Sequence, residues 1–458
     1  MLPAAAIARL TRAMCHTRPL ISVGATFPKG VPCRRKQGPL IGQRSGKSNN
    51  SVTFLVWPVA RPAANMQKRG NPMSHNMSAY VRKPETAPTI KNRITRFLSA
   101  GIAVFAVFTG MPCADADGFL PEQFTISSTV PPNGDLNPYG VAFVPQGFQS
   151  GTGPLRPGQI LVSNFNNNMN LQGTGTTIVR ASASGRPAVF FAGPPHPGGS
   201  SGLGLSTALA VLRNGFVIVG NVPSIDGTSR TATSGSLLVI NNEGHLVSTI
   251  SGPEIVGPWD MTVFDEGNQA IAFVSMVLSG RVVRLNLSVS VSSGGVTVTS
   301  TTVIASGYAH RGDPAAFEVG PTGLVYDQTT DILYVASTAD NAVFAVQNAA
   351  TRGNSGSRGT VIYTDAHHLH GPLGMAEAPN GHLLVSNSDV INSDPHQPSE
   401  IVEFTKQGQF VTQLSVDPLQ GGSFGLAVNV NSVDSFFAAV DDNTATLTLW
   451  RMPLSDDP

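Results

Sequence analysis

The chain has 458 residues, of which 41% are hydrophobic and 12% are charged, and its formal net charge is only +1. The charges are unevenly distributed, because residues 1–116 hold 17 Lys and Arg against two acids, whereas residues 117–458 hold 12 Lys and Arg against 26 Asp and Glu. The later part would repel phosphate groups, which argues against nucleic acid as a partner.

Residues 91–116 have the layout of a secretory signal peptide. Residues 91–96 are rich in Lys and Arg, residues 97–109 form an apolar stretch that is short for a membrane span, and Ala114-Asp115-Ala116 matches a small-residue cleavage site. We expect cleavage after Ala116 and a periplasmic or secreted protein. Residues 1–90 are expected to be a poorly structured leader, with Met77 as the best candidate for a later start; an unusually long leader or a retained membrane anchor is the alternative.

All three cysteines, Cys15, Cys33 and Cys113, precede the expected cleavage point. The exported body would therefore contain neither a disulfide nor a reactive thiol. It also lacks a second long apolar segment, so we expect no membrane span in residues 117–458.

From residue 117 onward the sequence predicts an all-β fold, because helical periodicity is almost absent and runs rich in Val, Ile, Thr and Phe alternate with turn residues. A short opening phrase precedes a hydrophobic strand six times. The third residues of these phrases are 68, 52, 63, 51 and 51 residues apart, which is the length of a four-stranded propeller blade. We therefore predict a six-bladed β-propeller over residues 117–458. The phrases are Pro138-Tyr139-Gly140, Ser206-Thr207-Ala208, Pro258-Trp259-Asp260, Pro321-Thr322-Gly323, Pro372-Leu373-Gly374 and Ser423-Phe424-Gly425.

The fourth repeat shows the expected blade most clearly, with predicted strands at residues 323–326, 332–336, 342–346 and 361–363. The last repeat stops at its third strand, and residues 124–130, ahead of the first repeat, can supply the fourth. Pairing of the two chain ends would close the ring and cover an exposed strand edge. Residues 296–304 are expected to lengthen the third blade rather than form a seventh, because no opening phrase precedes them.

The phrase Pro-x-Gly before a hydrophobic strand, followed by a second strand that ends in Ala or Ser plus Asn or Asp, resembles the NHL-type six-bladed propeller. The closest match is Pro321–Val346, and the resemblance covers roughly residues 119–453. It implies an architecture rather than an activity. The first repeat, from Asn137 to Ile178, is similar to a group of exported bacterial proteins of unknown role.

Propeller geometry predicts where a site would form. The loop that enters each inner strand and the loop that leaves each second strand emerge on the same face, at the mouth of the central channel. Polar side chains in these loops could hold a divalent cation, calcium or zinc, or a polyhydroxylated ligand. The alternative is that they bond the backbone of turns. The set comprises Asn164, Asn221, Asn387 and Asp441 after second strands, and His196, His310 and His370 before inner strands.

Three opening phrases place an aromatic residue in their middle position: Tyr139, Trp259 and Phe424. These rings could stack on a sugar or another flat ligand, or they could plug the channel. Asp260 replaces the usual glycine of its phrase, and we expect it either to cap the turn or to point into the channel. Arg311-Gly312-Asp313 is most simply a turn.

Two functions fit these predictions. The first is a binding or scaffold module whose rim loops engage a protein, a glycan or a small ligand. The second is a metal-dependent hydrolase or lyase similar to the gluconolactonase-like propellers, in which a cation polarises a carbonyl or activates water. That group places an acidic metal ligand on its first inner strand, and Gly140-Val141-Ala142-Phe143 contains none. The sequence therefore favours the binding module.

Overall fold

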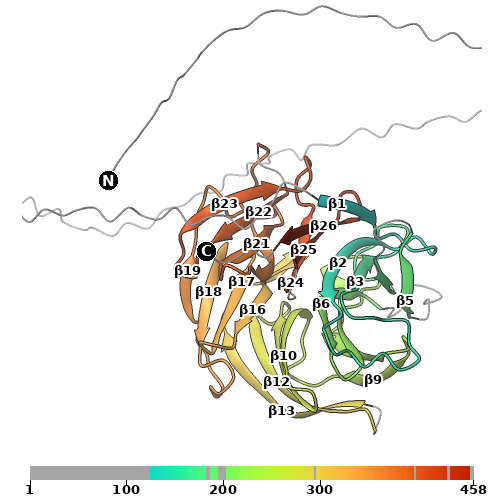
Figure 1. Cartoon of the computed structure of the whole chain (residues 1–458). Helices are drawn as coiled ribbons and strands as arrows, with labels where there is room; N and C mark the ends of the chain where they lie inside the picture. Colours follow the sequence, from blue (N-terminus) through green and yellow to red (C-terminus); the bar gives the residue numbers. More distant parts are fainter. Residues whose placement is uncertain are drawn as a thin grey trace, which may run out of the picture. The chain divides into compact units, whose positions relative to one another are not determined.

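The computed structural model describes residues 124–181, 186–193, 203–292, 295–396, 399–430 and 434–453. These residues form six four-stranded antiparallel sheets around a common centre (Figure 1). The predicted six-bladed all-β propeller is confirmed. The leader, the signal peptide and His196 lie outside the described residues. In the part of the chain that is described, no helix has the length and hydropathy of a membrane span.

Each blade runs from an inner strand at the hub to an outer strand at the circumference. Blade one consists of β2 (Leu136–Phe143), β3 (Ile160–Asn166), β4 (Thr177–Arg180) and β5 (Ala188–Ala192), and blade two of β6 (Leu205–Leu212), β7 (Phe216–Asn221), β8 (Ser236–Asn241) and β9 (Leu246–Ile250). Blade three consists of β10 (Pro258–Asp265), β11 (Gln269–Met276), β12 (Arg281–Ser290) and β13 (Gly295–Ser306), and blade four of β16 (Pro321–Asp327), β17 (Ile332–Ser337), β18 (Ala342–Gln347) and β19 (Thr360–Tyr363). Blade five consists of β20 (Pro372–Glu377), β21 (Leu383–Asn387), β22 (Glu400–Phe404) and β23 (Phe410–Ser415), and blade six of β24 (Ser423–Val430), β25 (Asp434–Asp441), β26 (Thr446–Pro453) and β1 (Phe124–Ser128).

The first strand of the propeller completes its last blade, as the sequence predicts. β1 pairs antiparallel with β26, from Phe124 opposite Trp450 to Ser128 opposite Thr446. Beyond the strand, the backbone N–H and the side-chain hydroxyl of Thr129 donate to the carbonyl oxygen of Ala445, at 3.0 and 2.8 Å. This pairing covers the edge that β26 would otherwise expose. The predicted assignment of residues 296–304 to blade three is also confirmed, because β13 pairs with β12.

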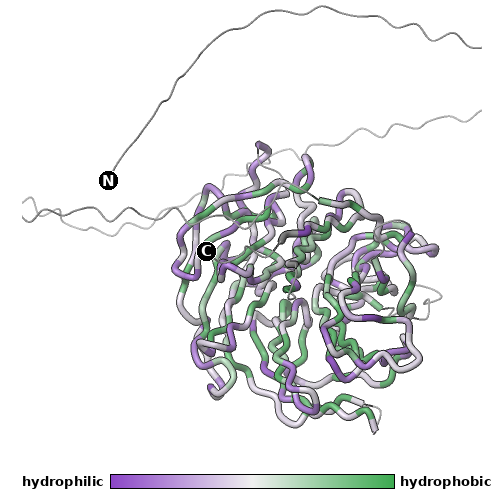
Figure 2. Tube along the Cα trace, in the orientation of Figure 1, coloured by the Kyte–Doolittle hydropathy of each residue, from purple (hydrophilic) through white to green (hydrophobic). Residues whose placement is uncertain are grey.

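Hydrophobic side chains fill the spaces between neighbouring sheets. Between blades two and three, Ile218 and Val239 of one sheet and Val274 and Leu285 of the next belong to one buried cluster. Strands such as β7 are apolar at nearly every position because a sheet covers each of their faces. Figure 2 shows hydrophobic segments along the strands near the hub and more hydrophilic ones in the outer turns.

The recurring opening phrase is a β-bulge. In all six inner strands the register with the second strand shifts within the phrase; for example, Pro321 pairs with Ser337, but Leu324 pairs with Val335. A bulge bends the strand and changes the direction of its side chains. The glycine of the phrase also packs tightly against the next blade, since a Cβ on Gly323 would lie 2.7 Å from the backbone nitrogen of Met375.

Serine hydroxyls of the second strands join neighbouring blades at the hub. Ser163 Oγ accepts a hydrogen bond from the Gly140 N–H at 2.9 Å and donates to the carbonyl oxygen of Ser206, in blade two, at 2.9 Å. Ser386 repeats this arrangement between blades five and six. Each hydroxyl therefore satisfies a backbone group that the bulge leaves without a partner in its own sheet.

An additional hairpin, formed by β14 (Arg311–Asp313) and β15 (Phe317–Val319), lies in the loop that leads into blade four. The turn predicted for Arg311-Gly312-Asp313 is wrong, because these residues form a strand. The reversal comes one step later, where Asp313 Oδ1 accepts hydrogen bonds from the N–H groups of Ala315 and Ala316. The 3₁₀ helix η1 (Ser229–Thr231), in the loop that leaves β7, is the only helix among the described residues.

Candidate functional site

Five aromatic rings close the centre of the channel, and we call them the aromatic plug. Neighbouring ring centroids within it lie between 4.8 and 6.0 Å apart. Two pockets lie along the channel and share no lining residue, so the plug separates them. The rings belong to Tyr139, Phe165, Trp259, Phe317 and Phe424.

The first pocket, called the rim pocket, has a volume of about 340 Å³. Its walls come from loops that enter inner strands and loops that leave second strands, which is the face on which the sequence places a site. Tyr139, Phe165 and Phe424 of the plug form its floor. Among the described residues that line it, none is Lys or Arg. Its polar lining includes Asn137, Asn166, Gln172, Glu318, Asp389 and Asp442.

Two carboxyl groups of the rim pocket titrate far from their ordinary range. Burial raises the pKa of Glu318 to about 7, although Arg311 partly opposes this shift. Burial also raises the pKa of Asp442 to about 7, and the adjacent Asp441 carboxylate adds to the effect. Each group therefore exchanges its proton near neutral pH and can either accept or donate a hydrogen bond there.

Three buried oxygen atoms in the same lining have no hydrogen-bond partner among the described residues. They are the Oδ1 atoms of Asn137, Asn166 and Asp389. The other oxygen of Asp389 is held in place by the N–H groups of Ser399 and Gly421, at 3.3 and 3.0 Å. A buried acceptor without a partner costs free energy, and a ligand that donates hydrogen bonds would remove that cost.

The four predicted strand-end residues are buried and do not line the rim pocket. Their hydrogen bonds hold loops in place. Asn387 Oδ1 accepts the backbone N–H of His370 at 2.9 Å, and its amide donates to the carbonyl oxygen of His368 at 2.7 Å. Asn221 Oδ1 likewise accepts the N–H of Gly204 at 2.9 Å. Ligand binding by these side chains stays a prediction; the set is Asn164, Asn221, Asn387 and Asp441.

The structure does not bring the predicted histidines together. His370 is buried, and its ring nitrogens face the carbonyl oxygens of Asn392 and, at 3.1 Å, His367. His310 is exposed, with Nδ1 3.2 Å from the carbonyl oxygen of Tyr308. Neither lines the rim pocket. In the described ranges, no three His, Cys, Asp or Glu side chains gather so that they could hold a metal ion, so a calcium or zinc site stays a prediction.

The remaining predicted residues fall on both sides of the plug. Tyr139 lies at the floor of the rim pocket, and Trp259 is fully buried beneath it. Asp260 lines the other pocket, where its Oδ1 accepts the N–H of Met261 at 2.7 Å. Asp260 thus caps the bulge and also faces the channel.

Sequence reasoning missed Glu318 and Asp442. Asp442 follows Asp441 directly after a second strand, so the Asp-Asp pair is a signal that could have identified it. Glu318 reaches the pocket only because the β14–β15 hairpin turns back over the hub, and no periodic pattern in residues 311–319 marks that hairpin.

A comparison with protein-family models gave no match, and neither did a comparison with curated proteins. Among solved structures, the chain is similar to a catalytically inactive virginiamycin B lyase from Staphylococcus aureus with quinupristin, at 13% identity over 73% of this chain and 90% of that chain, with a TM-score of 0.40. It is also similar to a candidate gluconolactonase, at 14% identity over 72% and 93% of the two chains with a TM-score of 0.40, and to a candidate glucose dehydrogenase from Thermus thermophilus, at 13% identity over 72% and 100% with a TM-score of 0.42. Such weak likeness assigns no activity. The six-bladed architecture rests on the strand pairing of this chain, and the NHL type stays a prediction.

Proposed function

We propose that the chain is an exported binding module whose rim pocket holds a small polyhydroxylated ligand, such as a single sugar ring. The observation that carries this proposal is the pairing of an aromatic floor with buried acceptor oxygens that lack partners. Sugars present an apolar ring face and several hydroxyl donors, which match these two features. The volume of about 340 Å³ is near the lower end for ligand pockets, which favours a small ligand.

Charge also supports a neutral ligand or one that donates hydrogen bonds. Glu318, Asp389 and Asp442 line the pocket, and no described Lys or Arg accompanies them there. Phosphates and carboxylates would meet uncompensated acids, so we do not expect anionic ligands.

The test is a binding screen of the purified chain against neutral mono- and disaccharides and polyols by ligand-observed NMR, followed by calorimetry. We expect Asp442→Asn to weaken binding of the best ligand about 10-fold when binding is measured at about pH 8.5, above the Asp442 pKa of about 7, because the carboxylate there only accepts hydrogen bonds whereas the amide also donates them. Glu243→Gln is the matched control, since Glu243 lies in the exposed turn between β8 and β9. The proposal fails if no sugar or polyol binds in the millimolar range, or if Asp442→Asn binds as tightly as the wild type.

Export is part of the same proposal. N-terminal sequencing of the form recovered outside the cytoplasm tests it, with Asp117 expected as the first residue. Recovery of the protein in the cytoplasm with residues 91–116 intact would contradict export.

A metal-dependent hydrolase or lyase is the second candidate. The observation that favours catalysis is that two lining carboxyl groups, Glu318 and Asp442, have a pKa of about 7, which suits a general acid or base at neutral pH. The test is turnover of lactones and glycosides in a pH-stat, with and without added calcium or zinc. Loss of turnover in Glu318→Gln with unchanged ligand binding would support catalysis, and absence of turnover under all conditions would leave the binding role.

A further inference from the structure

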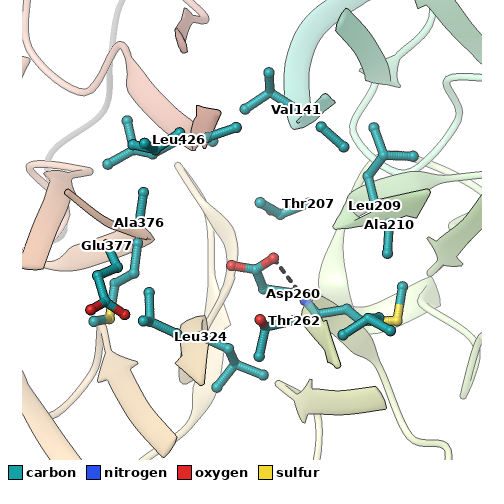
Figure 3. A pocket seen from close by; sticks show the side chains of 18 of the residues that line it. Val141, Thr207, Leu209, Ala210, Asp260, Thr262, Leu324, Ala376, Glu377 and Leu426 are labelled. Carbon is teal, nitrogen blue, oxygen red and sulfur yellow. Dashed lines mark hydrogen bonds between the residues drawn. The ribbon is translucent and has the colours of Figure 1, made fainter. Parts of the chain in front are cut away.

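The second pocket, which we call the channel pocket, lies on the other side of the aromatic plug and has a volume of about 400 Å³. The six inner strands β2, β6, β10, β16, β20 and β24 surround it (Figure 3). Its walls are mainly aliphatic and include Val141, Leu209, Leu324, Met375 and Leu426. Among the described lining residues there is no Lys or Arg, and none is shared with the rim pocket.

Two buried polar side chains interrupt these aliphatic walls. Asp260 is 9% exposed, and Figure 3 shows its carboxylate directed into the space between the inner strands. One carboxylate oxygen accepts the Met261 N–H. Thr207 is 6% exposed, and its hydroxyl has no hydrogen-bond partner among the described residues. A carboxylate and a free hydroxyl in an otherwise apolar pocket are costly unless something binds to them.

Closure of the propeller does not require an acidic residue at position 260. The equivalent residues of the other blades are glycines or, in blade two, Ala208. A Cβ on Gly323 or Gly374 would collide with the next inner strand, so those blades have no room for a side chain at this point. At this position of the opening phrase, blade three alone carries a polar side chain. The cap at the Met261 N–H uses the Asp260 side chain as an acceptor, but the other five blades close without an acid at this point, so the fold alone does not explain a carboxyl group that faces the channel.

A second acid lies at the mouth of the channel pocket, but it already has a partner. Glu377 Oε1 is 2.6 Å from Lys406 Nζ, and Lys406 also pairs with Asp327 at 2.8 Å. No described Lys or Arg pairs with Asp260. Burial raises the pKa of Asp260 well above its usual range, and hydrogen bonds from the backbone of Met261 and Leu324 oppose that shift only in part. The inner end of the channel pocket is therefore a buried carboxyl group without a cation beside it, and a bound cation would favour its ionised form.

We propose that the channel pocket binds a primary alkylammonium group. The ammonium donates hydrogen bonds to the Asp260 carboxylate and to the Thr207 hydroxyl oxygen, and its aliphatic chain packs along Leu209, Leu324 and Leu426. A single carboxylate with one hydroxyl is too small an oxygen set for calcium, which takes six to eight ligands, but it matches the three donors of an ammonium. A free alkylamine and a lysine side chain of a peptide share this chemistry.

The test measures binding of n-hexylamine and n-hexanol to the full chain by calorimetry or NMR titration. Both probes share the aliphatic tail, and only the amine carries the charge. We expect hexylamine to bind at least about 10-fold more tightly than hexanol, which corresponds to about 1.4 kcal/mol. Equal binding of the two probes to the wild type, or no binding of hexylamine, would overturn the proposal without any variant.

Variants then locate the site. Asp260→Asn and Thr207→Val are expected to weaken hexylamine binding, the first by about 10-fold or more. Glu377→Gln, at the mouth, and Asp442→Asn, in the rim pocket, are controls that should change it less than about 3-fold. Unchanged binding in Asp260→Asn would refute the assignment. If Asp260→Asn fails to fold, Thr207→Val and the comparison of hexylamine with hexanol still test whether the channel pocket binds the ammonium group.

Two further probes distinguish a lysine side chain from a free alkylamine as the natural ligand. They are a short peptide that contains one lysine and the same peptide with that lysine acetylated. Binding of the first alone identifies a lysine side chain, whereas binding of hexylamine but of neither peptide identifies a small amine. Because the two pockets share no lining residue, failure here leaves the sugar-binding proposal untouched, and the reverse also holds.

Discussion

Gly140→Ala tests whether the glycine of the opening phrase is required for the packing of neighbouring blades. A Cβ on Gly140 would lie 2.6 Å from Ser163 Oγ, 2.9 Å from Leu209 Cβ and 3.0 Å from the carbonyl oxygen of Thr207. Ordinary contact begins at 3.4 Å, so the Ser163 hydroxyl would have to move by about 0.8 Å. That shift strains both hydrogen bonds by which Ser163 joins blade one to blade two.

The expected cost follows from these contacts. Overpacking of this kind costs about 1–3 kcal/mol, and weakening two buried hydrogen bonds adds about 1 kcal/mol. Alanine has a lower chain entropy than glycine in the unfolded state, and this offsets about 0.4–1 kcal/mol of the lost stability. We therefore expect Gly140→Ala to lower the free energy of unfolding by about 1–3.5 kcal/mol.

Urea denaturation followed by tryptophan fluorescence measures this change. Gly353→Ala is the matched control, because Gly353 is exposed and a Cβ there would meet no atom within 4 Å. We expect the control to lie within about 0.5 kcal/mol of the wild type. If Gly140→Ala is as stable as the control, the blades tolerate a wider spacing and close packing at the hub is not the reason for the repeated glycine.

Three further predictions concern stability. Trp450→Ala should lower the free energy of unfolding, measured by calorimetry, by about 3–5 kcal/mol, because the indole is 2% exposed and stacks on Phe437. A loss below about 1 kcal/mol would contradict closure of the propeller by blade six. Glu318→Gln should have the same free energy of unfolding as the wild type near pH 4, and should become the more stable of the two as the pH rises to about 8. The reason is that the Glu318 pKa is about 7 in the folded chain and about 4.3 in the unfolded chain, so ionisation of the wild-type carboxyl group destabilises the fold. Urea titrations at several pH values that show no growing difference would contradict the burial of this group. Lys406→Met should lower the free energy of unfolding by about 1 kcal/mol at pH 7, because Lys406 pairs with Asp327. This loss should shrink as the pH falls from about 4 through the Asp327 pKa of about 2, where the carboxylate becomes protonated. A loss that stays constant with pH would show that charge pairing does not cause it.

The sequence was sufficient for the architecture because the architecture is repeated. Six bulged phrases, each before an apolar strand, predicted six blades, and the incomplete last repeat predicted the pairing of β1 with β26. A feature that occurs once gives no such signal. The β14–β15 hairpin was missed for this reason, and Arg311-Gly312-Asp313 was predicted as a turn.

The site was less predictable because nearness to the channel does not fix where a side chain points. Asn387 and Asn221 lie at the expected ends of second strands, but their side-chain oxygens accept hydrogen bonds from the backbone N–H groups of buried loops and do not face the rim pocket. The aromatic plug also separates residues that are neighbours in one phrase, since Trp259 is fully buried whereas Asp260 faces the channel pocket. Packing at the hub decided these outcomes, and strand periodicity carries no information about it.

The pairing of β1 with β26 has a consequence for biosynthesis. Blades one to five each consist of strands that are consecutive in the chain, so they can assemble as the ribosome releases them. Blade six cannot, because Thr129 and Ala445, whose hydrogen bonds extend the pairing, are 316 positions apart. Contacts between such distant segments form slowly. A nascent chain that stops short of residue 446 therefore ends as an open arc, however stable its other blades are.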